Sequence, residues 1–128
     1  MKIAVIVIRS LTGALLIFGS LAYFFHLVTP PPLTGNMKIF NEGMEASGYL
    51  LNLVKGTELV IGISLITGFF VPLSLIVISP VIINILFVHI FLDTEGLPIA
   101  VFLVFANSFL GYAHWKSFSH LFKPKTDY

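Results

Sequence analysis

The sequence predicts an all-α polytopic membrane protein: an antiparallel four-transmembrane-helix bundle with a short amphipathic surface helix between the first two transmembrane helices. Composition is the first observation that predicts this class. Hydrophobic residues make up 57% of the 128 residues and charged residues only 10%, whereas soluble domains average about 45–50% apolar and about 25% charged residues. So few charged groups cannot cover the surface of a globule in water, and a soluble domain is excluded.

The same composition excludes several functions. The net charge is +1, and the longest basic run is Lys123-Pro124-Lys125, so the chain lacks the basic patch that a nucleic-acid partner requires. The chain contains no cysteine, which excludes disulfides, thiolate metal sites and iron–sulfur clusters. We expect no metal site and no intrinsic cofactor.

Hydrophobic segments of transmembrane length are the second observation. A transmembrane helix needs about 20 mainly apolar residues, and four stretches meet this requirement: residues 3–28, 50–69, 71–92 and 97–115. A closed barrel is the only other structure that satisfies its backbone in lipid, and these stretches lack the alternation of a barrel strand. Residues 1–128 are therefore predicted to form a single transmembrane domain.

The long connection between the first two stretches predicts the surface helix. It begins with Pro30-Pro31-Pro32, a run that cannot form helical hydrogen bonds. In residues 37–46, Met37, Phe40 and Met44 then recur at helical spacing. This spacing predicts a short amphipathic helix on the membrane surface that ends at a glycine. A plain loop is the alternative, because short apolar periodicities are ambiguous.

The other two connections are short. Pro72 and Pro98 each suit the first turn of a new helix, where the missing N–H group costs nothing. Tight hairpins of this kind make consecutive helices antiparallel neighbours in a bundle.

The distribution of charge predicts that both termini are cytoplasmic. Four spans place the termini on one side of the membrane, and that side carries Lys2, Lys116, Lys123 and Lys125. The short loop on the opposite side carries Asp93 and Glu95. The positive-inside rule then orients the chain with its lysine-rich side in the cytoplasm.

Five polar residues in the outer half of the predicted bundle form the candidate ligand-binding site: Lys55, Glu58, Asn84, His89 and His26. A charged side chain in a bilayer costs roughly 2.5–3.5 kcal/mol on insertion scales, so its presence needs a reason. Lys55 and Glu58 share one helical face and have opposite charges; a salt bridge that only fixes helix packing is the alternative to a functional pair. Asn84 and His89 are about 140° apart on an ideal helix, so they cannot both face one centre.

Five further residues are assigned structural roles. Gly62 continues the Lys55–Glu58 face and predicts a close helix approach there, as Gly13 does in the first span. Arg9 is interpreted as a topology anchor near the inner interface. Pro80 is expected to kink the third span, and Asn107 to form a hydrogen bond across the bundle.

Several segments together form a recognisable set: Arg9…Gly13…Phe18-Gly19, Ser47-Gly48-Tyr49-Leu50, Val54-Lys55-Gly56-Thr57-Glu58, Phe70-Val71-Pro72-Leu73 and Pro80…Asn84…His89…Asp93. The set resembles the DoxX family of small four-helix membrane proteins, over almost the whole chain. The resemblance implies a location in the bacterial inner membrane. It also implies kinship with the quinone-reducing subunit of a thiosulfate oxidoreductase and with membrane partners in oxidative-stress complexes. It assigns no catalytic residue.

Two functions are consistent with these observations. In the first, the chain binds a quinone or lipid in the outer half of the bundle as a subunit of a membrane redox system; Lys55, Asn84 or His89 would donate hydrogen bonds and Glu58 would carry protons. The chain carries no recognisable electron carrier, so other membrane subunits would supply electrons and catalysis by this chain alone is not expected. In the second, the chain is a non-catalytic accessory or assembly subunit of a larger complex. Haem bound by His26 and His89 is a less favoured third interpretation.

Overall fold

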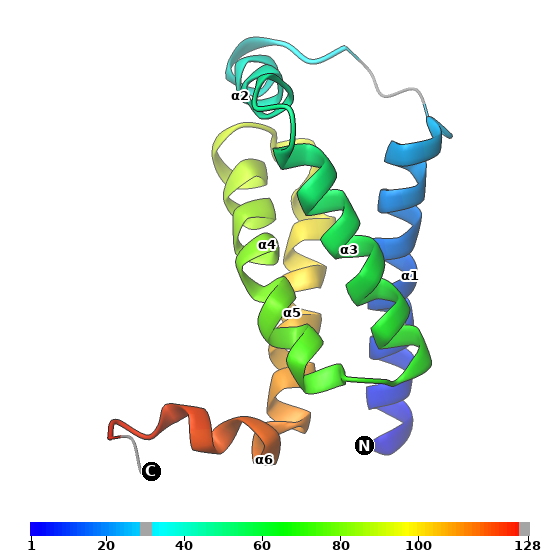
Figure 1. Cartoon of the computed structure of the whole chain (residues 1–128), viewed down its shortest axis with the longest axis vertical. Helices are drawn as coiled ribbons and strands as arrows, with labels where there is room; N and C mark the ends of the chain where they lie inside the picture. Colours follow the sequence, from blue (N-terminus) through cyan, green and yellow to red (C-terminus); the bar gives the residue numbers. More distant parts are fainter. Residues whose placement is uncertain (29–31, 126–128) are drawn as a thin grey trace.

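The computed structural model describes residues 1–28 and 32–125, and it is built from helices and short connections (Figure 1). The prediction of an all-α four-helix bundle is confirmed. Four helices are long and apolar enough to cross a membrane, the last of them together with the short turn before it: α1 (Lys2–Phe25), α3 (Leu50–Thr67), α4 (Val71–Phe91) and α5 (Leu97–Ala113). The chain is therefore a multi-pass membrane protein.

α1 ends earlier than predicted. Its last residue is Phe25 rather than residue 28, because His26 adopts the left-handed conformation with φ 54°. Residues other than glycine rarely adopt this conformation, and a right-handed helix cannot continue through it. The backbone N–H group of His26 still donates to the Ala22 carbonyl oxygen and closes the last turn.

The predicted surface helix is α2 (Gly35–Ala46). It lies at one end of the bundle, which we call the α2 end (Figure 1). Met37, Phe40 and Met44 are half-buried along one face, whereas Ile39 is 67% exposed on another. The helix is thus amphipathic as predicted. Of the predicted proline run, Pro30 and Pro31 lie outside the described residues.

The remaining connections are short turns. Gly68 (φ 84°) and Phe70 (φ 55°) turn the chain between α3 and α4, while η1 (Thr94–Gly96) joins α4 to α5. Pro72 and Pro98 occupy the first turns of α4 and α5, as predicted.

Two short elements follow α5: α6 (Trp115–Phe118) and η2 (Ser119–Phe122). They lie at the same end of the bundle as the start of α1, and they extend sideways from its axis (Figure 1). We call this the terminal end. It is the end opposite α2.

An aliphatic core fills the space between the four long helices. Its most deeply buried members come from α3, α4 and α5: Leu65, Ile78, Ile82, Ala100, Ala106 and Leu110. Many large apolar side chains lie outside this core; Phe18 is 60% exposed and Phe105 59%. Apolar surface of this extent is unfavourable in water and favourable against lipid chains.

Candidate functional site

The site begins where α1 and α3 cross at two glycines. A Cβ atom added to Gly13 would lie 2.8 Å from the Gly62 carbonyl oxygen, and one added to Gly62 would lie 2.9 Å from the Gly13 carbonyl oxygen. The two backbones are therefore in direct contact, a spacing that only glycine allows. This crossing fixes which α3 side chains face α1.

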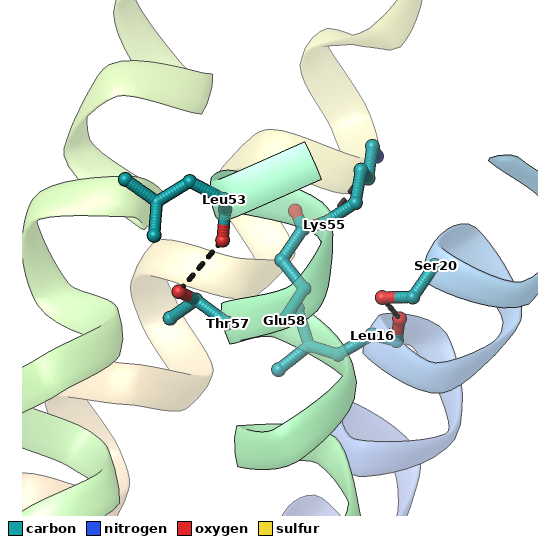
Figure 2. A network of polar contacts seen from close by, with 6 residues as sticks. All are labelled: Leu16, Ser20, Leu53, Lys55, Thr57 and Glu58. Carbon is teal, nitrogen blue, oxygen red and sulfur yellow. Dashed lines mark hydrogen bonds and ion pairs between the residues drawn. The ribbon is translucent and has the colours of Figure 1, made fainter. Parts of the chain in front are cut away.

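Lys55 and Glu58 lie next to the crossing, on its α2 side. The Glu58 Oε2 atom is 3.2 Å from the Lys55 Nζ atom, and the Glu58 residue is only 5% exposed. Figure 2 shows Glu58 extending towards Lys55, with Ser20 on the neighbouring α1. Ser20 is also buried, but its hydroxyl group donates to the Leu16 carbonyl oxygen of its own helix at 2.7 Å and is therefore not available to Glu58. Lys55 is thus the one charge that balances the Glu58 carboxylate among the described residues.

A pocket of about 360 Å³ lies at the α2 end, where α1, α2 and the first turn of α3 meet. Its polar lining residues are Tyr23, His26, Glu45, Tyr49 and Asn52. The Tyr23 hydroxyl donates to the Asn52 Oδ1 atom at 3.0 Å and so links α1 to α3. Because Oδ1 accepts this bond, the donor half of the Asn52 amide is left for another partner.

The pocket and the ion pair lie on the same helix at different depths. Asn52 precedes Glu58 by six residues, which is about 9 Å along the helix axis at 1.5 Å per residue. Lys55 lies between them, and its side chain is 29% exposed. A polar stretch of α3 therefore runs from the pocket to the buried carboxylate.

His89 belongs to a different part of the molecule. Its Nδ1 atom is 2.9 Å from the Asp93 carbonyl oxygen; since a carbonyl only accepts, Nδ1 carries the proton and donates. The imidazole also lies so close to Gly96 that a Cβ atom there would overlap it. The Asp93 carboxylate in turn accepts the Glu95 N–H group at 3.1 Å. His89 therefore closes the turn between α4 and α5.

The five residues predicted to bind a ligand consequently fall in separate places. Lys55 and Glu58 form the buried pair, His26 lines the pocket at the α2 end, and His89 holds the α4–η1 turn. Asn84 and His89 face different surroundings, as the angle of about 140° between them on one helix requires: Asn84 is exposed on α4, and His89 is bonded within the turn that follows.

The residues with predicted structural roles occupy packing positions. The Arg9 guanidinium lies over Gly68, whose added Cβ would be 3.1 Å from Nη1; a cation is favourable there because the C-terminal carbonyl groups of α3 carry partial negative charge. The Asn107 Nδ2 group donates to the Ser79 Oγ atom at 3.0 Å, from α5 to α4. Pro80 is inside α4, which continues through it.

Four polar residues of the pocket were not predicted as site residues from the sequence: Tyr23, Glu45, Tyr49 and Asn52. One signal was present for Asn52, which precedes Lys55 by three residues and therefore shares its helical face. No comparable signal marked Tyr23 and Glu45, because their proximity depends on how α2 folds over the end of the bundle. In the described part of the chain, no group of three His, Asp or Glu side chains is placed to hold a metal ion.

Comparisons with protein-family models, with curated proteins and with solved structures find no match for this chain. What the site can do therefore follows from its own geometry.

Proposed function

We propose that the chain is a DoxX-like membrane subunit that binds a quinone, or a lipid of similar size, in the pocket at the α2 end, as part of a membrane redox system. The observation that carries this proposal is the pocket itself. A volume of about 360 Å³ is within the usual range for small-molecule sites, about 300–1,000 Å³. It lies at the end of a transmembrane bundle, where a lipid-soluble molecule can enter from the membrane.

The lining of the pocket suits a quinone headgroup. The rings of Phe24 and Tyr49 provide flat apolar walls, as aromatic side chains do in ligand sites. The free amide donor of Asn52 and the imidazole of His26 are the groups that would donate hydrogen bonds to the two quinone carbonyl oxygens. The exposed apolar side chains Phe24 and Phe25 of α1 would lie beside the isoprenoid tail.

Lys55 and Glu58 give the pocket a route for protons. Reduction of a quinone to a quinol takes two electrons and two protons, and an ionisable pair inside a membrane typically belongs to a proton or substrate path. In this proposal Glu58 carries protons along α3 to the pocket. The electrons come from a partner subunit, and this chain binds and orients the quinone.

Binding of a short-chain ubiquinone analogue to the purified protein in mild detergent tests the proposal. The variant Asn52→Leu is expected to weaken binding about tenfold, because one hydrogen bond to the ligand is lost. The matched control Asn84→Leu makes the same change at an exposed position of α4 and should bind as the wild type does. Equal affinity of the wild type and Asn52→Leu would reject the pocket. Co-purification of phospholipid alone, identified by mass spectrometry, would identify the ligand as a lipid.

The accessory role is the alternative, and one observation favours it. Ile39 is 67% exposed on α2, beside the exposed Lys38–Glu42 ion pair, so α2 presents a mixed apolar and charged face to a neighbouring protein. A stoichiometric protein partner that is lost in Ile39→Asp, in a preparation free of quinone, would support this role instead.

A further inference from the structure

The terminal end of the bundle holds two adjoining pockets that differ in chemistry. The first, about 410 Å³, lies between α4, α5 and the segment that α6 and η2 form, and its lining is mainly aliphatic and aromatic. The second, about 490 Å³, is lined in part by His114, Lys116 and Ser117. Tyr112 and Trp115 line both pockets, so the two pockets adjoin at these side chains.

The segment of α6 and η2 has an apolar face directed at the first pocket. Phe118 is 7% exposed, and the rings of Trp115 and Phe122 stack with their centroids 5.2 Å apart. The segment extends sideways, away from the bundle axis (Figure 1), which is the orientation of a helix in the plane of a membrane surface. Aromatic residues at this level are typical of the boundary between lipid chains and headgroups.

The first pocket has room for an acyl chain. Gly111 lines it, and a Cβ atom added to Gly111 would meet nothing within 4 Å. Two polar groups of the same wall are used inside the protein: the Asn107 Nδ2 group donates to Ser79, and Ser79 donates to the Leu75 carbonyl oxygen at 2.6 Å. The space beside Gly111 is therefore suited to a hydrocarbon chain.

The charge around the second pocket is positive. Lys116 lines this pocket, and Lys123 follows Phe122, which lines the first. Within residues 1–28 and 32–125, no acidic residue lies at the terminal end; the carboxylates belong to α2, α3 and η1 or its N-cap. A phosphate group is the ligand that Lys and Ser side chains at a membrane surface bind, and anionic lipids are attracted to such basic clusters.

We infer that these two pockets form a binding site for one anionic phospholipid, whose acyl chain occupies the space beside Gly111 and whose phosphate lies against Lys116 and Ser117. The site is independent of the quinone pocket, because it lies at the opposite end of the bundle. It would hold the α6–η2 segment against α4 and α5 from within the adjoining leaflet.

Native mass spectrometry of the full chain, released from nanodiscs of equal phosphatidylglycerol and phosphatidylcholine, tests the inference. We expect the wild type to retain one phosphatidylglycerol molecule in preference to phosphatidylcholine. Gly111→Leu fills the acyl-chain space and should reduce this retention at least fivefold. Gly19→Leu is the matched control, since Gly19 of α1 also has no atom within 4 Å of an added Cβ; it should retain lipid as the wild type does.

A second variant keeps the test decisive if Gly111→Leu does not fold. Lys116 is exposed, so Lys116→Gln leaves the packing unchanged and should abolish the preference for phosphatidylglycerol. Equal retention of the two lipids by the wild type would overturn the inference. So would full retention in Gly111→Leu or Lys116→Gln, or an equal loss in Gly19→Leu.

Discussion

At the residue scale, the two members of the buried ion pair are unequally placed. The side chain of Glu58 is 6% exposed, whereas that of Lys55 is 29% exposed and lies nearer the α2 end. Lys55 can extend its ammonium group towards the interface along its flexible stem, as lysines near helix ends do. The shorter Glu58 side chain cannot extend its carboxylate group to the interface in this way. The carboxylate therefore depends on the lysine more than the lysine depends on the carboxylate.

This asymmetry predicts different costs for the two single substitutions. Lys55→Met leaves a buried carboxylate without its cation and should destabilise the protein by about 3 kcal/mol. Glu58→Met leaves a lysine that reaches the interface and should cost about 1 kcal/mol. The double variant should recover most of the loss, because two apolar side chains pack there without unpaired charge. Unfolding in mixed micelles measures all three.

The same variants separate a functional pair from a packing bridge. If the pair carries protons to a quinone, the stable double variant loses quinone-linked activity of the assembled complex while retaining its fold. A double variant with wild-type activity would assign the pair to packing alone. Equal costs for the two single substitutions would contradict the asymmetry of burial.

Contacts between side chains of one helix could be predicted from the sequence, whereas contacts that depend on the path of a turn could not. Lys55 and Glu58 meet because a spacing of three places them on one helical face. His89 was assigned to the same site by its depth, but its actual partner is the Asp93 carbonyl group. That contact exists only because the chain leaves α4 and enters η1 at this point, and no side-chain pattern encodes the position of a backbone carbonyl.

At the element scale, the crossing of α1 and α3 is the contact that positions the site. Its geometry follows from two glycines that the sequence marks as small residues on polar faces. The pocket at the α2 end was not predictable in the same way. It forms because α1 ends at Phe25, where the next residue, His26, has φ 54°. It also requires α2 to pack over this end of the bundle. Both features depend on tertiary structure.

Alanine substitution of Gly13 tests the crossing. The added methyl group would lie 2.8 Å from the Gly62 carbonyl oxygen, and a backbone atom cannot move aside as a side chain can. We expect a loss of about 1–2 kcal/mol in the free energy of unfolding: overpacking costs about 1–3 kcal/mol, and the better helix propensity of alanine returns up to about 1 kcal/mol.

Gly19→Ala is the control, on the same helix with open space around the added Cβ. It should leave stability unchanged or raise it by less than about 1 kcal/mol. Thermal unfolding in the same detergent compares the two variants. If Gly13→Ala were as stable as Gly19→Ala, the helices could not be in backbone contact at this position.

At the scale of the whole molecule, the charges are sorted between the two ends of the bundle. Lys2, Lys116 and Lys123 lie at the terminal end, whereas the short turn at the opposite end carries Asp93 and Glu95. The transmembrane helices place these groups on opposite sides of a bilayer, and the positive-inside rule predicts that the terminal end is cytoplasmic. The proposed quinone pocket would then open at the outer leaflet, and the proposed phospholipid would belong to the inner leaflet.

Cysteine labelling tests this orientation. The chain contains no cysteine, so a single introduced cysteine is the only thiol of the protein that can be labelled. Thr94 and Ser117 are both exposed. Thr94 belongs to η1, between α4 and α5, and Ser117 to α6 at the other end of α5. In intact cells a membrane-impermeant maleimide should label Thr94→Cys, and it should label Ser117→Cys only after the membrane is permeabilised. The reverse pattern would mean that the protein has the opposite orientation, with the proposed quinone pocket in the cytoplasmic leaflet. Labelling of both variants in intact cells would mean that a lysine-rich end can lie outside, against the positive-inside rule on which the orientation depends.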